Sequence, residues 1–441
     1  MHRTASVCPV CLKRIPAVRT ERNGHMYQEK TCPEHGTFST VLWRGSEPLE
    51  HWTGPREETG LEEGLRCPQD CGLCGKHLRK TCCTLLEVTD RCNLHCKFCF
   101  ADNAQTRDPS LEQVKGWIDH IAALTDGTFL QLSGGEPTLR DDLPEIVAYA
   151  RQAGCPYIQV NTNGLRLAED PAYVKALARA GLDVAFLQFD GVTEGVYRTL
   201  RGRDLLAIKE AAIQACGAAR IGVTLVPTLV PGVNTEQIGA ILRYGMARTP
   251  AVRGVHFQPV SYFGRIPQRP SEAQRYTMGE LLDAVVDQTD GLVPRESLVP
   301  SSCDHPLCGL HGDYIVLPDG LEALSKRGSQ PAACCCGADP AQQNRDYIGK
   351  RWSRSDAPLE KSCCTPEAAD GPSCCSATDP DLHSLEGFLQ WKRTHGFTIT
   401  SMNFQDAGNL DLERLRQCSL HVYRGGKLIP FCAAYLTAFP A

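Results

Sequence analysis

The sequence predicts an α/β fold, a partial barrel of six βα units flanked by an N-terminal and a C-terminal Cys-rich metal-binding module. Six short apolar segments alternate with helical segments between residues 84 and 260, a spacing typical of a parallel sheet with crossover helices. The 24 cysteines are concentrated at the two ends, since only Cys155 and Cys216 fall between residues 100 and 300. We therefore expect an N-terminal module at 1–83, a core at 84–290, and a C-terminal region at 291–441 with a flexible Cys-rich insertion at about 328–380.

The expected elements follow from hydrophobic periodicity. Six strands are expected, at 84–89, 128–132, 157–162, 184–189, 221–226 and 255–260. Apolar residues at helical spacing predict the intervening helices, at 111–124, 143–153, 171–180, 205–219 and 237–247. Six strands rather than eight favour an open or partial barrel. Two further strands are expected in the tail, at 399–404 and 427–432. The N-terminal module has few periodic apolar segments, so we expect it to need bound metal to fold.

Composition and charge exclude several classes of protein. Hydrophobic residues make up 42% and charged residues 22% of the chain, as in ordinary globular proteins. The formal charge of −5 gives no support to a nucleic-acid partner. The chain has no apolar run long enough to span a membrane and no apolar segment typical of a secretory signal, so we expect a cytoplasmic location. Structural disulfides are rare there, which favours metal ligation by the cysteines.

The strongest chemical signal is a C-x3-C-x2-C motif formed by Cys92, Cys96 and Cys99, with Phe98 before the last cysteine. The motif follows the first expected strand, so it lies at the carboxyl end of the sheet, where α/β active sites form. Three thiolates can bind three irons of a [4Fe–4S] cluster and leave the fourth iron open. The spacing alone is equally compatible with a zinc knuckle or with a cluster completed by a distant fourth cysteine.

Polar residues at the ends of the next three strands are candidates for binding a cofactor or substrate. The second strand ends in Ser133, Gly134, Gly135 and Glu136. Glycines let backbone approach a ligand closely, and the glutamate offers a carboxylate to an ammonium group. Asn163 and Asp190 follow the third and fourth strands and are expected to face the same cavity. Polar residues that cap turns are an equally good explanation for these last two.

Together these motifs resemble the radical S-adenosylmethionine (SAM) superfamily, in which C-x3-C-x-aromatic-C precedes a Gly-Gly-Glu-type motif. The resemblance implies that the three cysteines hold a [4Fe–4S] cluster whose open iron chelates SAM. It implies that Phe98 packs near the adenine, that 133–136 bind the methionine end, and that 255–258, with Gln258, passes beside the adenine. The implied reaction is reductive cleavage of SAM to a 5′-deoxyadenosyl radical, which takes hydrogen from an unactivated C–H bond. A reductant such as ferredoxin or flavodoxin would supply the electron.

Three further groups of potential ligands lie outside the core. One combines C-x2-C with C-x2-H, which suits a mononuclear Zn or rubredoxin-like Fe site: Cys8, Cys11, Cys32 and His35. A second supplies four thiolates, enough for an auxiliary [4Fe–4S] cluster: Cys67, Cys71, Cys74 and Cys82. A third is a candidate for a second auxiliary cluster, with His305 and His421 as spare ligands: Cys303, Cys308, Cys418 and Cys432. The alternative is that some of these cysteines are buried free thiols.

These groups, with the tail segments 402–413 and 428–432, resemble a radical SAM subfamily that includes archaeal tetraether-lipid synthases and pterin methylases. The resemblance implies C–C coupling on a lipid or other apolar substrate as the leading expectation, with peripheral contact to a lipid surface. The alternative is methyl transfer or sulfur insertion on a pterin, a peptide or a small metabolite.

Seven cysteines between residues 334 and 375 have no counterpart in that subfamily. Neighbouring thiols can bind Cu(I), Zn or a metalloid, or exchange electrons with disulfides. A hypothesis of another class is therefore a thiol-rich metal or metalloid carrier, and a zinc scaffold is a further one. A disordered linker without a specific role explains the segment equally well.

Overall fold

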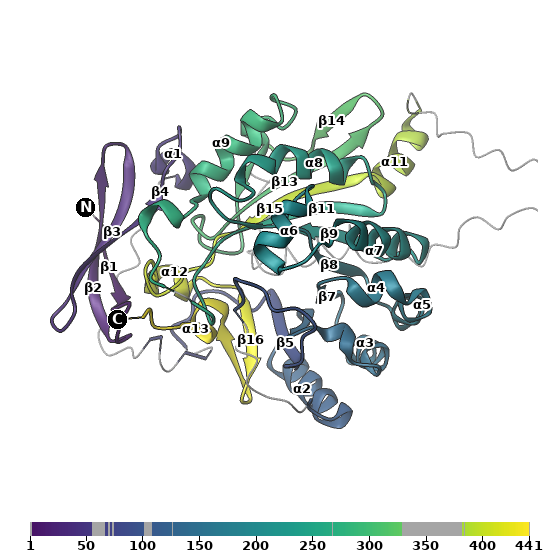
Figure 1. Cartoon of the computed structure of the whole chain (residues 1–441), viewed down its shortest axis with the longest axis horizontal. Helices are drawn as coiled ribbons and strands as arrows, with labels where there is room; N and C mark the ends of the chain where they lie inside the picture. The colour runs from purple at the N-terminus through teal and green to yellow at the C-terminus, as the bar shows by residue number, and fades with distance from the viewer. Residues whose placement is uncertain are drawn as a thin grey trace, which may run out of the picture.

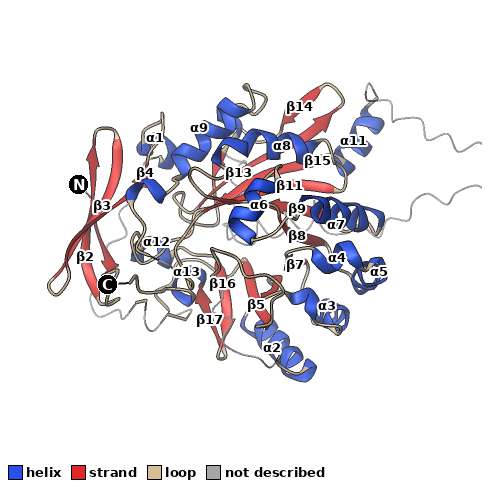
Figure 2. Ribbon diagram, in the orientation of Figure 1, coloured by secondary structure: helices blue, strands red, loops and turns tan. Residues whose placement is uncertain are grey.

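The computed structural model describes residues 2–54, 67–68, 71–72, 75–100, 108–125, 127–266, 268–328, 382 and 384–440. The described chain forms a four-stranded sheet and a 13-stranded sheet (Figures 1 and 2). Within these residues, no helix is long and apolar enough to cross a membrane. The expected Cys-rich insertion lies outside the described residues except at its first position.

The N-terminal sheet is antiparallel and follows chain order: β1 (His2–Val7), β2 (Arg14–Arg22), β3 (His25–Cys32) and β4 (Gly36–Trp43). Asn23 and Gly24 connect β2 to β3 with φ of 52° and 76°, and positive φ at both residues is what a type I′ hairpin turn requires. Our sequence analysis did not anticipate this sheet. Its strands are rich in polar residues on both faces, and the Asn-Gly pair was the local signal that could have revealed it.

The six predicted strands form the centre of the large sheet. They are β5 (Cys83–Thr89), β6 (Phe129–Gly134), β7 (Ile158–Thr162), β8 (Val184–Gln188), β9 (Gly222–Val226) and β11 (Val252–Pro259). All six are parallel and neighbour one another in chain order. Successive βα units with short connections produce this order. The predicted α/β class and the six-strand core are therefore confirmed.

The five predicted helices cover one face of this sheet (Figure 1). They are α2 (Leu111–Leu124), α3 (Leu143–Gln152), α5 (Pro171–Ala180), α7 (Leu206–Ala218) and α8 (Ile238–Met246). Their apolar stripes pack on alternate strand residues: Ile118 and Ile146, for example, share a fully buried cluster with Leu130 and Val160. The short helices α4 (Leu165–Glu169) and α6 (Glu194–Arg201) were not predicted.

Strands from the tail extend the core sheet at both edges. Beyond β11 lies the parallel strand β15 (Gly396–Met402), followed by the antiparallel β13 (Gly309–Leu317). Beyond β5 lies the parallel strand β16 (Leu420–Arg424), followed by the antiparallel β17 (Lys427–Pro430). The remaining elements are α1 (Leu49–Thr53), β10 (Thr228–Leu229), α9 (Met278–Gln288), β12 (Val299–Pro300), β14 (Gly320–Ala323), α11 (Leu385–Thr394), α12 (Leu412–Arg416) and α13 (Phe431–Ala434).

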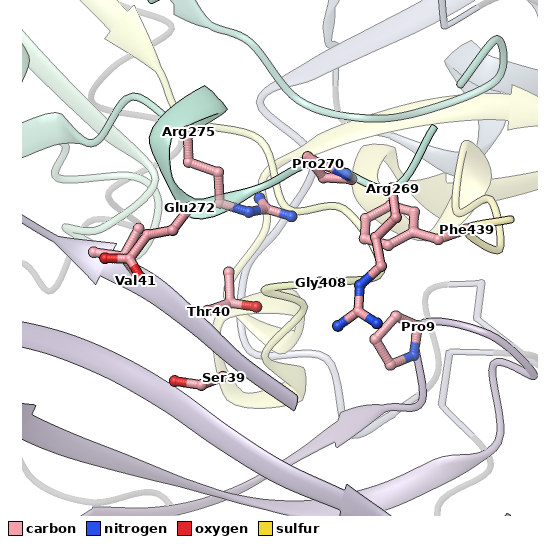
Figure 3. Close-up of a pocket in the computed structure, with 10 residues that line it drawn as sticks. All are labelled: Pro9, Ser39, Thr40, Val41, Arg269, Pro270, Glu272, Arg275, Gly408 and Phe439. Atoms are coloured by element: carbon pink, nitrogen blue, oxygen red, sulfur yellow. The ribbon is translucent and has the colours of Figure 1, made fainter. Parts of the chain in front are cut away.

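The N-terminal sheet docks on the tail and on the start of α9 (Figure 1). Thr4 Oγ1 donates to Asp411 Oδ1 at 2.7 Å, and Arg19 Nη2 donates to Asp411 Oδ2 at 2.6 Å. A cavity of about 30 Å³ remains at this junction, and Figure 3 shows Thr40 of β4, Arg269 and Phe439 around it.

Candidate metal and cofactor site

The C-x3-C-x2-C loop and the Gly-Gly-Glu segment meet at the carboxyl ends of β5 and β6. The backbone N–H of Gly135 donates to Thr89 O at 2.7 Å, and that of Glu136 donates to Arg91 O at 2.7 Å. A Cβ on Gly134 would lie 2.1 Å from Thr89 O, and one on Gly135 would lie 2.2 Å from Arg91 O. In the structure these glycines let β6 approach the backbone of the cysteine loop, and their contact with a ligand stays a prediction.

Glu136 connects the ends of two neighbouring strands. Its side chain is 1% exposed, and its Oε1 accepts hydrogen bonds from the backbone N–H and the hydroxyl of Thr138 and from the hydroxyl of Thr162. Oε2 accepts the backbone N–H of Asn163 at 2.7 Å. The carboxylate that we expected to meet an ammonium group therefore already carries four hydrogen bonds from this chain.

Asn163 and Asp190 reach the site through other side chains. Asn163 Nδ2 donates to Asn93 Oδ1, within the cysteine loop, at 2.7 Å. Asp190 is fully buried, and its two oxygens accept hydrogen bonds from Arg201 at 2.6 and 2.7 Å. Both carboxylate oxygens of Asp190 therefore bind Arg201. A role of Asn163 or Asp190 in binding SAM stays a prediction.

Two residues that we did not single out from the sequence contact Cys96. Gln188, at the end of β8, places Nε2 at 3.9 Å from Cys96 Sγ, and the Arg201 guanidinium lies close enough for a hydrogen bond to the same thiol. Gln188 Oε1 is buried and has no hydrogen-bond partner within the described part of the chain. An orphaned polar atom beside a thiol indicates space for a bound group. Only the position of Gln188 at a strand end, two residues before Asp190, could have suggested it.

The three thiols are near enough to act electrostatically on one another, and Cys96 is buried while Cys92 and Cys99 are half-buried. Burial raises the pKa of the Cys92 thiol to about 11, and the charges of Glu136, Cys96 and Cys99 act in the same direction. A thiol of this kind ionises readily only when a cation binds it, as in a metal site. The donor set and the orphaned Gln188 oxygen therefore fit an iron–sulfur cluster with a further ligand.

The remaining predicted SAM contacts lie around the same strand ends. Phe98 is half-buried and packs edge-on against Tyr262, with ring centroids 6.1 Å apart. Gln258 is half-buried near the end of β11, and Ser133 is buried near the end of β6. These placements are compatible with the expected contacts, which stay predictions.

The first predicted metal site is assembled in the N-terminal sheet. The ligand atoms of its four residues all lie within 4.8 Å of one another: Cys8, Cys11, Cys32 and His35. Leu12 adopts a φ of 56° and its N–H donates to Cys8 O at 2.9 Å, which closes the turn that carries the first two ligands. Three sulfurs and one imidazole at such separations match a tetrahedral metal centre.

The other predicted cluster ligands are only partly brought together. Cys308, Cys418 and Cys432 line one cavity of about 20 Å³, beside Arg414. Cys303 does not line it, because its thiol pairs with that of Cys82, which we had assigned to the other auxiliary cluster. Cys67 and Cys71 pack against the apolar cluster that contains Cys432. Cys74 lies outside the described residues. Both auxiliary ligand sets stay predictions, because the described residues bring neither set together completely.

The face of the sheet opposite the helices, which we call the inner face, is rich in carboxamides. Side chains alternate between the two faces of a strand, so the residues between the helix-packed ones point to this side. Its polar members are half-buried or buried: Gln131, Gln159, Asn161, Gln188, Thr224, His256 and Gln258. Gln159 Nε2 donates to Asn161 Oδ1 at 3.2 Å, and burial lowers the pKa of His256 to about 4.

Comparisons with known proteins agree with this geometry. Residues 86–245 match the model of the radical SAM superfamily, and residues 1–44 match that of the HMPTM N-terminal zinc ribbon domain. The chain is 33% identical to 7,8-dihydro-6-hydroxymethylpterin dimethyltransferase of Methanocaldococcus jannaschii, over 98% of this chain and 92% of the relative. The chain belongs to the radical SAM superfamily. The cofactors of this radical SAM enzyme are a [4Fe–4S] cluster and SAM, and the ribbon match supports zinc at the N-terminal site.

Two more distant similarities cover about half of the radical SAM enzyme. GTP 3′,8-cyclase of Pelotomaculum thermopropionicum is 30% identical over 47% of this chain and 64% of its own length. The crystal structure of Streptococcus suis SuiB bound to S-adenosylmethionine matches with a TM-score of 0.41 and 16% identity, over 50% of each chain.

Proposed function

We propose that this radical SAM enzyme methylates a pterin or a closely similar heterocycle. The observation that carries the proposal is the polar inner face, which presents carboxamides of Gln131, Gln159 and Asn161 on neighbouring strands. A pterin ring has an edge of alternating hydrogen-bond donors and acceptors, and a carboxamide offers one of each. The relative that matches over nearly the full length is named for a dihydropterin substrate.

A long apolar chain, our leading expectation from the sequence, fits this face less well. Binding such a chain would place these carboxamides, among them the unpaired Gln188 Oε1, against hydrocarbon, and an unpaired amide oxygen opposes binding. The relatives described above are not named for lipid C–C coupling. We therefore place the pterin ahead of the lipid, and sulfur insertion behind both.

The roles of the site residues form part of the same proposal. Cys92, Cys96 and Cys99 would hold the cluster, which supplies the electron that cleaves SAM. Gln188 would orient a ligand through its free oxygen, and Glu136 would fix the cysteine loop against β6 and β7. We further propose the division into 1–83, 84–290 and 291–441, and a reducing compartment, the cytoplasm, with ferredoxin or flavodoxin as electron donor.

The first test concerns the cluster. Wild-type enzyme incubated anaerobically with SAM and dithionite should form 5′-deoxyadenosine, and Cys96→Ala should form none. Cys216→Ala is the matched control, because this thiol is also buried but lies in α7, on the helix-covered side of the sheet. Equal yields from the wild type and Cys96→Ala would remove this loop from the reaction.

The second test concerns the substrate. With 7,8-dihydro-6-hydroxymethylpterin added, mass spectrometry should detect a methylated pterin, whereas a dispersed long-chain lipid should remain unchanged. Gln159→Leu should weaken pterin binding about 3–10-fold, the value of one hydrogen bond, in isothermal titration calorimetry. Gln152→Leu, on the exposed side of α3, should bind like the wild type. Conversion of the lipid and not the pterin would overturn the proposal.

A further inference from the structure

His421 of β16 and the neighbouring His77 take no part in the proposed reaction, although the sequence offered His421 as a spare ligand for the third cysteine group. His421 is 0% exposed, and neither of its ring nitrogens has a hydrogen-bond partner in the described part of the chain. The Ser419 carbonyl is near enough to act on the ring but does not meet hydrogen-bond geometry. A buried imidazole with two unsatisfied nitrogens is unfavourable unless a ligand binds it.

The second histidine is already oriented as a metal ligand would be. His77 packs against His421 with ring centroids 5.1 Å apart and an interplanar angle of 66°. Its Nε2 lies 2.7 Å from Cys418 O, so Nε2 carries the proton and Nδ1 is left as the acceptor. Metal-binding histidines commonly donate their other N–H to a backbone carbonyl, which fixes the tautomer and the orientation of the ring.

The separation of the rings also fits a shared ion. Two imidazoles on one tetrahedral ion, with metal–nitrogen bonds of about 2.1 Å, place their ring centres roughly 5 Å apart. Histidine binds metals as the neutral imidazole, and the burial of His421 opposes a positive charge on the ring.

This pair is separate from the cavity lined by the C-terminal cysteines. Leu420 and Val422 of β16 pack in the cluster that contains Cys432 and Phe431. Because side chains alternate along a strand, His421 points to the other face. Tyr423, which shares that face, contacts His120 of α2. His421 thus lies on the helix side of the sheet, on the strand that pairs with β5, and His77 packs against it.

We propose that His77 and His421 together bind one divalent transition-metal ion, zinc or ferrous iron, as a site distinct from the three predicted cysteine sites. The ion would join the segment that carries His77 to β16. Imidazole pairs bind both metals, and other cations such as Mg²⁺ or Ca²⁺ prefer oxygen ligands.

The test measures metal directly and needs no substrate. Reconstituted protein is desalted anaerobically, and zinc and iron per chain are determined by plasma emission spectrometry. His421→Phe and His77→Gln should each lose about one equivalent of one of the two metals relative to the wild type. His120→Phe is the matched control, because it removes a neighbouring imidazole whose Nδ1 already pairs with the Tyr423 hydroxyl.

His77→Gln keeps the experiment decisive if His421→Phe fails to fold. His77 is only half-buried, and a glutamine amide can still donate to Cys418 O while lacking the ring nitrogen that binds the ion. If His77→Gln folds, as judged by circular dichroism, and retains the zinc and iron content of the wild type, the pair binds no metal and the proposal is wrong. Which metal is lost distinguishes zinc from iron.

Discussion

The carboxylate of Glu136 joins three parts of the candidate site. It accepts hydrogen bonds from Thr138, Thr162 and the backbone of Asn163, and its own backbone N–H donates to Arg91 in the cysteine loop. Because every one of these groups is a donor, the carboxylate must stay an acceptor at both oxygens. The carboxylate thus joins the ends of β6 and β7, the backbone N–H joins β6 to the cysteine loop, and contact with SAM stays a prediction.

We expect Glu136→Gln to destabilise the fold by about 1–3 kcal/mol, because an amide N–H would replace one acceptor and face another donor. Urea unfolding of the metal-reconstituted protein measures this change. Glu112→Gln, an exposed residue at the start of α2, is the control and should change the free energy of unfolding little. A Glu136→Gln variant as stable as the wild type would show that the four hydrogen bonds do not define this site.

Lys209 is a buried lysine that lies behind the same strand ends. Its Nζ donates to Asn163 O at 2.5 Å, and burial lowers its pKa from 10.5 to about 8. Between pH 8 and pH 10.5, Lys209 is protonated in the unfolded chain and neutral in the folded chain. The free energy of unfolding therefore rises with pH over this range. Below pH 8 the folded protein carries the cost of the buried charge, about 3 kcal/mol for a shift of this size.

We expect Lys209→Met to remove this pH dependence. Relative to the variant, the wild type should gain up to about 3 kcal/mol of unfolding free energy between pH 8 and pH 10.5. Urea unfolding at a series of pH values measures the difference, with Lys175→Met, an exposed lysine on α5, as the control. Parallel pH profiles for the wild type and Lys209→Met would contradict the prediction.

The end of β6 is the element on which the assembly of the site depends. Gly134 has a φ of 129°, and any side chain there would meet the carbonyl of Thr89 on β5. Two parallel strands can approach in this way only where one of them lacks a Cβ. The packing of β5 against β6 therefore requires glycine at position 134, independently of any contact with a cofactor.

Gly134→Ala should cost at least about 3 kcal/mol of unfolding free energy, because strain in φ adds to the collision with Thr89 O. Gly116→Ala is the matched control: this glycine is exposed in α2 and a Cβ there meets nothing within 4 Å. The control should stabilise the protein by about 0.5–1 kcal/mol through its higher helix propensity. Differential scanning calorimetry measures the Tm of both variants. Similar Tm values for Gly134→Ala and Gly116→Ala would contradict the packing argument.

Most of the core elements could be predicted because each is a local pattern. The stretches 111–124 and 171–180 carry helical periodicity and begin at a Ser110 cap and at Pro171, and both helices have those bounds in the structure. The pairing of β16 with β5 could not be predicted, since it joins residues more than 300 positions apart and leaves no trace in either segment. The contacts of Cys96 with Gln188 and Arg201 were missed because they also join segments far apart in the sequence.

Across the whole molecule, the tail holds the other parts together. Its strands flank the core sheet at both edges, and the segment around Asp411 receives the N-terminal zinc ribbon (Figure 1). Lys30 of β3 donates to Ala407 O at 2.8 Å, and Ser6 of β1 donates to Leu410 O at 2.5 Å. The ribbon is thus attached through buried polar contacts, which depend on exact partners, in addition to the apolar contacts of Val7 and Trp43.

Asp411 is the centre of this attachment. Burial alone would raise its pKa, but the Arg19 guanidinium and the Thr4 hydroxyl hold the pKa below its usual value. The stability that this carboxylate contributes is therefore present above pH 3.8 and is lost as the pH falls through the lower, folded-state pKa. Arg19 is 12% exposed and Asp411 is fully buried, so breaking the pair leaves a charge with little water around it.

We expect Asp411→Asn to cost about 3–5 kcal/mol, the usual effect of removing one partner of a buried ion pair. Hydrogen exchange read by mass spectrometry should show faster exchange in β1–β4, while the core strands β6–β8 keep the protection of the wild type. Glu34→Gln, which removes the partner of the exposed Lys13 on the same ribbon, should leave the exchange unchanged because water already screens that pair. Equal protection of β1–β4 in Asp411→Asn and the wild type would mean that the ribbon is held by its apolar contacts and its metal instead.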